Sequence, residues 1–429
     1  MHSSPVAKRS ALSWLPRRLR PVAFAVMVLV AAPLPAQVPG GLSFERALAL
    51  ATERAPMLAA RQTALEGAAQ LRSSADQLPD PRLTVGVDNF PVGGAERYSF
   101  TREPMTQRSI GWMQDVPNRD KRAARAQGAQ ARAERERALL DAERVGVQRE
   151  VAQAWLARFF VERRLALFKT LEDENRLLRQ TVDARIASGR AMPTDSTMAR
   201  QEALMLADRR DELQRERAQA QATLTRWLGD EARQALAGDP PALQADAAAL
   251  HGAIARHADL LAFEPMLRMT NAELREIEAA KKGDWNWQVG YSKRGQAYGD
   301  MVSFQLSFEL PLWASQRQDP QIAAKHKEAE RIGAEREDLL RKRREELDMQ
   351  LAELEEIARK AERLKASSGP LAGERLALAL AAYESARGDL AAVLGARRER
   401  AELGLRAIEL EARQQTLRAK LNYLIAEPR

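Results

Sequence analysis

Ser109-Ile110-Gly111-Trp112-Met113-Gln114-Asp115-Val116-Pro117 is a short run of alternating character, and a long charged helical stretch follows it. A second run has the same alternation and is also followed by a long charged helical stretch: Ser303-Phe304-Gln305-Leu306-Ser307-Phe308-Glu309-Leu310-Pro311. The two closing prolines lie 194 residues apart (311 − 117). Solenoid repeats have periods of roughly 20–50 residues, so this is a different kind of repeat. The pattern predicts a duplicated unit of domain size, in which each copy holds a strand pair and a very long helix.

The composition favours long helices and gives no sign of catalysis. Charged residues make up 29% and aromatic residues 5% of the 429 positions, a mixture typical of coiled coils. Cysteine is absent, which excludes disulfides, thiolate metal sites and a catalytic thiol. The four histidines form no metal-ligand pattern with carboxylates, and no phosphate loop, nucleophile elbow or zinc-protease motif occurs. We therefore expect no enzyme activity, no cofactor and no bound metal.

The net charge of +8 raises the question of nucleic-acid binding. The arginines alternate with Glu and Asp at helical spacing, as on solvated helix faces, and no basic run is interleaved with aromatic residues. A nucleic-acid partner is therefore not expected.

Residues 1–36 have the features of a signal peptide. Basic residues such as Arg17 and Arg18 precede a short apolar run over 21–32, and small residues follow up to Ala36. An uncleaved anchor is the alternative. No later stretch is long and apolar enough for a transmembrane helix, so a membrane crossing would require strands.

Four segments of roughly ten residues have one apolar and one polar face, which is the pattern of transmembrane β-strands. They cover 82–89, 107–116, 285–292 and 301–310. The alternative is a soluble ribbon packed on helices. Aromatic residues in or beside these strands are candidates for contact with lipid and its interface: Trp112, Trp285, Trp287, Tyr291, Phe304, Phe308 and Trp313. Four strands cannot close a barrel, and lipid does not tolerate an open sheet edge, so several chains must pool their strands.

The remaining segments are predicted to be helical, with breaks at Gly and Pro. Ser43 is expected to cap the first helix and Pro56 to kink or break it. The first repeat spans 37–229, with helices at 43–77, 118–188 and 195–228; a linker follows at 230–246. The second repeat spans 247–429, with helices at 247–282, 315–387 (interrupted near 367–372) and 390–425.

The two helical hairpins align without gaps. The turn and helix-end residues Ile186, Gly189, Asp195, Ala199 and Leu224 each precede a counterpart by 197 residues. These counterparts are Tyr383, Ala386, Ala392, Ala396 and Leu421.

Taken in order, these features resemble an outer-membrane efflux channel of the TolC family. The resemblance covers the whole chain after the signal segment. It rests on the opening Leu42-Ser43-Phe44-Glu45-Arg46-Ala47-Leu48, on both strand-proline-helix junctions and on both hairpin turns, including Tyr383-Glu384-Ser385-Ala386-Arg387-Gly388-Asp389. The stretches Leu78-Pro79-Asp80-Pro81, Gln114-Asp115-Val116-Pro117-Asn118-Arg119 and Gly369-Pro370 resemble the branch that works with cobalt-zinc-cadmium or copper-silver exporters.

The resemblance implies a homotrimer in the outer membrane, with one pooled β-barrel and a helical tunnel in the periplasm. Such a channel is a passive duct that exports substrate, here heavy-metal cations, together with a periplasmic adaptor and an inner-membrane proton-driven pump of the RND type. Drug efflux, type I secretion and a soluble coiled-coil adaptor are the alternatives.

Family members close the tunnel end with Tyr, Arg and Asp side chains. Tyr383 and Asp195 stand at matching positions, whereas the family's arginine position is Gly388 here. Arg387 and Asp389 are therefore the candidate substitutes. The alternative is that both are ordinary turn residues.

Overall fold

The computed structural model describes residues 41–295 and 298–426. The predicted signal peptide at 1–36 lies outside the described residues. The described chain is mainly helical with one four-stranded antiparallel sheet, so the predicted fold class is confirmed. Among these residues, no helix is both long and apolar enough to span a bilayer.

The first repeat begins with two short helices, α1 (Phe44–Arg54) and α2 (Pro56–Ser74). The Ser43 Oγ accepts a hydrogen bond from the Arg46 N–H at 3.2 Å, so Ser43 is the predicted cap. The helix breaks at Ala55, which is extended, because the ring of Pro56 disfavours a helical residue before it. The single helix expected over 43–77 is thus two helices.

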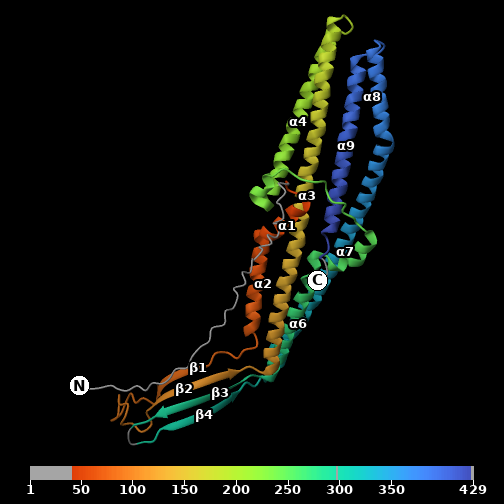
Figure 1. Ribbon diagram of the computed structural model, residues 1–429. Helices are drawn as coiled ribbons and strands as arrows, with labels where there is room; N and C mark the ends of the chain where they lie inside the picture. Colours follow the sequence, from red (N-terminus) through yellow and green to blue (C-terminus); the bar gives the residue numbers. More distant parts are fainter. Residues whose placement is uncertain (1–40, 296–297, 427–429) are drawn as a thin grey trace, which may run out of the picture. The chain divides into compact units, whose positions relative to one another are not determined.

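The long helix α3 (Arg119–Ala187) has 69 residues, which corresponds to roughly 100 Å at a rise of 1.5 Å per residue. Helix α4 (Pro193–Leu228) returns antiparallel beside its distal half (Figure 1). Helices α2, α4, α6 (Phe263–Ala279) and α9 (Leu390–Asn422) all pack against α3. Helix α3 therefore carries contacts with both repeats.

The prediction of one helix over 247–282 was wrong. A 3₁₀ turn η1 (Gly229–Arg233) leads into the linker, and the expected helix is divided into five pieces. These are α5 (Ala247–Ala253), η2 (Ile254–Arg256), η3 (Ala258–Leu260), α6 and η4 (Ala280–Lys282). The break at His257 has a tertiary cause: the backbone is extended there and forms a bridge with Ile425, while the flanking Ile254 and Leu260 are buried against distant helices.

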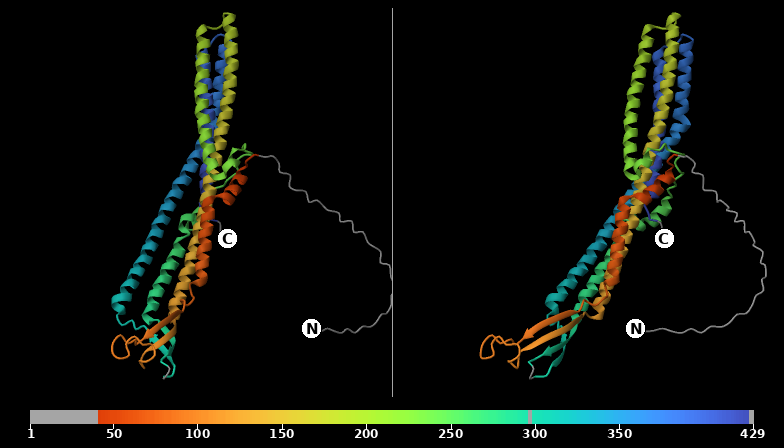
Figure 2. Two further views of the ribbon diagram at one scale, coloured as in Figure 1. Left: turned by 90° about the vertical axis from the view of Figure 1, so that its left-hand side faces the viewer. Right: turned by 60° about the vertical axis from the view of Figure 1, so that its left-hand side comes forward.

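In the second repeat, α7 (Ala314–Arg363) passes through a π-helical turn η5 (Leu364–Ser368) into α8 (Gly369–Glu384). The interruption therefore lies just before Gly369-Pro370, slightly earlier than the predicted 367–372. The return helix α9 ends at Asn422 rather than 425, because the chain then leaves to reach His257. The α8–α9 hairpin stands beside the α3–α4 hairpin (Figures 1 and 2).

The sheet contains β1 (Arg82–Asp88), β2 (Gln107–Val116), β3 (Trp285–Lys293) and β4 (Met301–Phe308), in that order and all antiparallel. The last strand ends two residues before the expected 310. Strands β2 and β3 join the two repeats in one sheet, with Trp112 opposite Val289 and Gln114 opposite Trp287. Within the described chain, β1 and β4 each keep one edge without a partner strand.

Candidate functional site

The strand register places apolar side chains together on one face of the sheet. Directly paired residues of antiparallel strands point to the same face. One row across all four strands is Leu83, Trp112, Val289 and Phe304, and the next row is Val85, Ile110, Tyr291 and Val302. Further rows add Trp287 with Leu306 and Trp285 with Phe308. The alternation that predicted four separate strands has therefore produced one continuous apolar surface.

This apolar face is largely open within a single chain. Trp112 is 47%, Phe304 64% and Phe308 67% exposed, and Trp287 is half-buried. Trp313, just after the sheet, is also exposed. A soluble ribbon would bury such residues against helices, whereas contiguous exposed apolar patches mark binding surfaces for membranes or partners. The seven aromatic residues predicted to lie at a bilayer are thus placed on or beside one exposed surface.

The opposite face of the sheet is polar and carries small residues. One row reads Thr84, Gly111, Gly290 and Ser303, and neighbouring rows contain Gln288 with Gln305 and Asn286 with Ser307. A sheet with one polar and one apolar face, both accessible, suits a boundary between water and an apolar phase.

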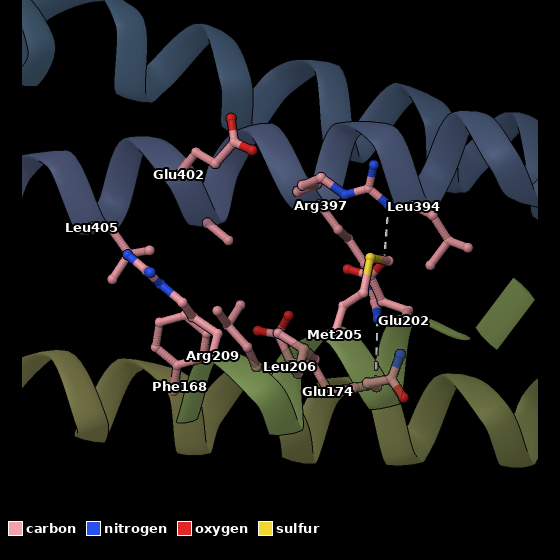
Figure 3. Close-up of a pocket in the computed structure, with 14 residues that line it drawn as sticks. Phe168, Glu174, Glu202, Met205, Leu206, Arg209, Leu394, Arg397, Glu402 and Leu405 are labelled. Atoms are coloured by element: carbon pink, nitrogen blue, oxygen red, sulfur yellow. Dashed lines mark hydrogen bonds and ion pairs between the residues drawn. The ribbon is translucent and has the colours of Figure 1, made fainter. Parts of the chain in front are cut away.

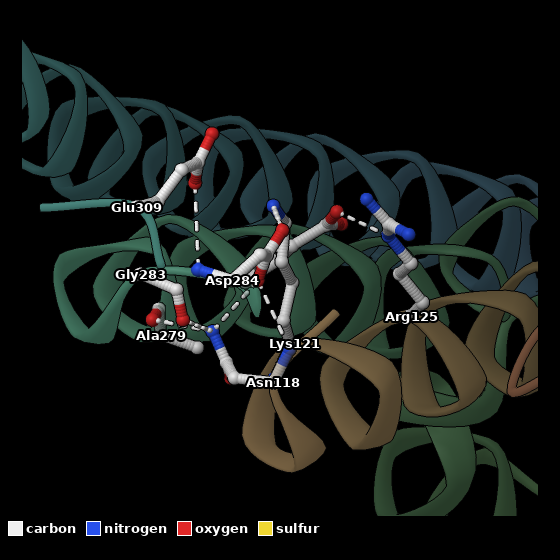
Figure 4. A network of polar contacts seen from close by, with 8 residues as sticks. Asn118, Lys121, Arg125, Ala279, Gly283, Asp284 and Glu309 are labelled. Carbon is white, nitrogen blue, oxygen red and sulfur yellow. Dashed lines mark hydrogen bonds and ion pairs between the residues drawn. The ribbon is translucent and has the colours of Figure 1, made fainter. Parts of the chain in front are cut away.

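A polar network joins the sheet to α3. The Asp284 carboxylate accepts hydrogen bonds from the Asn118 N–H at 2.9 Å and from the Lys121 ammonium at 2.7 Å (Figure 4). The Asn118 side chain also caps α3 by accepting the Lys121 N–H at 2.9 Å, and it donates to the Ala279 carbonyl at 3.0 Å. Burial acts to raise the pKa of Asp284, but the hydrogen bonds from Lys121 and Asn118 and the charges of Lys121 and Arg125 together lower it by more, so the pKa lies below its ordinary 3.8.

At the far ends of the hairpins, the two repeats use the same turn. In the first, the N–H of Arg190 bonds the Arg185 carbonyl at 2.8 Å, around Gly189 at φ +71°. In the second, the N–H of Arg387 bonds the Ala382 carbonyl at 2.9 Å, around Ala386 at φ +56°. Both are helix ends closed by a left-handed residue, and the positions correspond at the spacing of 197.

Tyr383 lies between the two hairpins and contacts Arg185, a residue that the sequence analysis missed. The Arg185 guanidinium lies 4.4 Å from the centre of the Tyr383 ring and donates to the Tyr383 carbonyl at 2.9 Å. The Tyr383 hydroxyl is buried, and no described residue offers it a hydrogen bond. Burial, aided by the negative charge of Asp195, raises the pKa of Tyr383, while Arg185 opposes the shift.

The other predicted gate residues have local structural roles. Asp389 caps α9 by accepting the Ala392 N–H at 2.8 Å, and Asp195 accepts the Met192 N–H at 3.2 Å at the start of α4. The Arg387 side chain is exposed. A side chain is hindered at Gly388, because its Cβ would stand 3.0 Å from that of Ala382. The Tyr383 ring is thus paired with Arg185, and Asp195 acts on Tyr383 only through its charge.

No group of three or more His, Asp or Glu side chains in the described ranges is arranged to hold a metal ion.

Comparison with known proteins identifies the fold. No family model and no curated protein matches the chain. A membrane protein from Pseudomonas aeruginosa matches with a TM-score of 0.75 at 20% identity, over 89% of this chain and 92% of that one. CusC matches with 0.73 at 15% identity, over 90% and 92%, and the CmeC outer membrane channel of Campylobacter jejuni with 0.72 at 10%, over 90% and 87%. The chain thus has the TolC-like fold that its sequence predicted.

Proposed function

We propose that this chain is a subunit of a homotrimeric outer-membrane channel in a tripartite efflux system. The observation that carries the proposal is the two-faced sheet, whose apolar face is exposed and whose outer strands both have free edges in the described chain. Backbone groups at a free edge are costly in lipid, so the strands need further copies to close. Three copies of four strands would make twelve, an even number within the range of known barrels.

In this arrangement the aromatic face meets outer-membrane lipid and the polar face lines a water-filled lumen. The long helices extend the lumen into the periplasm, where the hairpin ends would meet a periplasmic adaptor and an inner-membrane RND-type pump. The pump would supply the energy and this chain a passive duct. The matching structures named as outer membrane channels share the fold, which supports the proposal through architecture.

For the substrate, we propose heavy-metal cations. The support is the sequence resemblance of Leu78-Pro79-Asp80-Pro81 and Gln114-Asp115-Val116-Pro117-Asn118 to the heavy-metal branch, segments that lie at the junction of sheet and helices. Deletion of the gene is expected to lower tolerance to zinc, cobalt, cadmium or copper. Unchanged metal tolerance with lowered drug tolerance would favour the drug-efflux alternative, and lost secretion the type I alternative.

A neighbouring pair of substitutions tests the membrane placement. Phe304 lies on the apolar face and Gln305 on the polar face of the same strand. Phe304→Arg is expected to cost about 2–4 kcal/mol if it faces the middle of the bilayer, and to reduce recovery in outer-membrane fractions. Gln305→Arg is expected to assemble normally. Recovery of the unmodified protein as a soluble monomer would instead support the coiled-coil adaptor reading.

A further inference from the structure

A cavity of about 380 Å³ lies where α3, α4 and α9 meet, away from both the sheet and the hairpin turns (Figure 3). Its volume is within the range of roughly 300–1,000 Å³ that small-molecule sites occupy. Much of its wall is apolar, built by Phe168, Leu171, Met205, Leu206, Leu394 and Leu405. Such a wall suits the hydrocarbon part of a ligand.

One cation in this wall forms no direct ion pair with a described residue. Arg397 is half-buried, and no carboxylate in the described ranges lies within ion-pair distance of it. Its Nη1 donates to the Glu174 carbonyl at a long 3.3 Å, and its Nε is buried without a hydrogen-bond partner. Burial lowers the pKa of Arg397, but a guanidinium stays charged at neutral pH. A half-buried charge without an ion pair is stabilised by an anion.

A second donor without a partner lines the same cavity. Asn175 on α3 is only 4% exposed, and its Nδ2 finds no acceptor among the described residues. Buried amide groups in folded proteins are almost always hydrogen-bonded. Arg397 and Asn175 thus each bring to this cavity a buried nitrogen without a hydrogen-bond partner in the described chain.

The carboxylates that line the cavity pair with other residues, and those of Glu174 and Glu202 act on Arg397 only at longer range. Glu202 forms an ion pair with Arg398 at 3.0 Å, and Glu174 forms one with Arg400 at 3.9 Å. Glu402 is exposed, and its carboxylate points away from Phe168 (Figure 3). None of these three carboxylates forms a direct ion pair with Arg397.

We propose that this cavity binds a small amphiphilic anion, a medium-chain alkyl carboxylate, with its head on Arg397 and Asn175 and its chain among the leucines. The bound molecule would join the α3–α4 hairpin to α9 and so stabilise the packing of the two repeats. This site is additional to the proposed duct.

Photo-crosslinking localises the ligand without depending on membrane insertion or assembly. The full-length protein in detergent is exposed to a decanoate analogue that carries a diazirine, and labelled peptides are mapped by mass spectrometry. We expect label on peptides that contain Met205, Leu394 or Leu405, and competition by decanoate but not by decyltrimethylammonium. The readout is independent of channel function, so failure of the proposed duct would leave this result unaffected.

Variants identify the head-group site. Arg397→Gln is expected to weaken labelling roughly tenfold or more, as for loss of a charge-assisted hydrogen bond. Arg406→Gln, an exposed arginine on the same helix outside the cavity, is the matched control and is expected to label normally. Ala401→Trp fills the cavity while keeping Arg397, so it is also expected to abolish labelling. It provides the test if Arg397→Gln does not fold. Label confined to the sheet, label unchanged in Arg397→Gln, or equal competition by the cation would overturn the proposal.

Discussion

At the scale of single residues, the contact of Arg185 with Tyr383 can be tested by substitution. The ring stacks under a guanidinium while the hydroxyl has no hydrogen-bond partner in the described chain. The ring rather than the hydroxyl therefore holds the hairpin ends together. A cation–π contact contributes about 0.5–2 kcal/mol, depending on how far it is desolvated.

We therefore expect Arg185→Gln to destabilise the hairpin ends by about 1–2 kcal/mol. Tyr383→Phe is the matched variant: it keeps the ring and removes only the buried hydroxyl, so we expect it to be neutral or slightly stabilising. Hydrogen exchange of the amides in 376–394 measures local opening in each variant. A larger loss in Tyr383→Phe than in Arg185→Gln would mean that the hydroxyl carries the contact, contrary to this structure.

Ala386 provides a second prediction, since it adopts a left-handed conformation at φ +56° where the first repeat has Gly189. A side chain in this region is strained, and glycine removes the strain at some cost in unfolded-state entropy. Ala386→Gly is expected to stabilise the second turn by about 0.5–1 kcal/mol, and Gly189→Ala to destabilise the first by a similar amount. Hydrogen exchange at each turn gives both values. Faster exchange in Ala386→Gly would contradict the assigned turn.

At the scale of elements, local sequence signals predicted local structure well. Ser43 and Pro56 act on their immediate neighbours, and the strand alternation needs no tertiary context. The helix expected over 247–282 failed because His257 is extended by a bridge to Ile425, a partner far along the chain. Arg185 was missed for the same reason: its partner is 198 residues away. The spacing of 197 residues between the repeats was the sequence signal that could have located Arg185, because it aligns the adjacent Ile186 with Tyr383.

The junction of the sheet and the helices depends on Asp284, whose carboxylate accepts hydrogen bonds from both Asn118 and Lys121. Asp284→Asn removes the ion pair and leaves the half-buried Lys121 without it, so we expect a loss of about 1–3 kcal/mol. Asp120→Asn is the control, because its pair with Lys282 is exposed and contributes little. Chemical unfolding followed by circular dichroism compares the two. Equal effects would show that the Asp284 network does not support the junction.

The same carboxylate predicts an acid-sensitive junction. The pKa of Asp284 is lower in the folded protein than its ordinary 3.8, so the unfolded chain binds the proton more readily. Its contribution is therefore complete above about pH 4 and is lost as the pH falls through the lower folded-state value. Asp284→Asn should show a shallower loss of stability below pH 4 than the unmodified protein. Parallel curves would contradict this assignment.

At the scale of the whole molecule, the two repeats share one sheet, and the proposed channel needs further copies of the chain to close that sheet into a barrel. Strands β2 and β3 pair with each other across the two repeats. Strands β1 and β4 are therefore the edge strands of the sheet in the described chain. Because the order alternates in direction, β4 of one copy can pair antiparallel with β1 of the next. The apolar face would then continue around the assembly without interruption.

Cysteine crosslinking tests this pairing directly, because the natural sequence contains no cysteine. Neighbouring strands lie close enough for a disulfide, provided that the two side chains share a face. Thr84→Cys on β1 is combined in turn with Ser303→Cys, Gln305→Cys or Ser307→Cys on β4, all on the polar face. At least one combination is expected to give covalent dimers and trimers, and nothing larger, after oxidation in the membrane.

The control for this experiment follows from the two-residue period of a strand. Thr84→Cys combined with Phe304→Cys places the two thiols on opposite faces, so it should remain monomeric under the same oxidation. Covalent oligomers from this mismatched pair would indicate random collision rather than strand pairing. If none of the polar-face combinations crosslinks while the protein is in the membrane, β1 and β4 do not meet, and the shared sheet on which the channel proposal depends does not form.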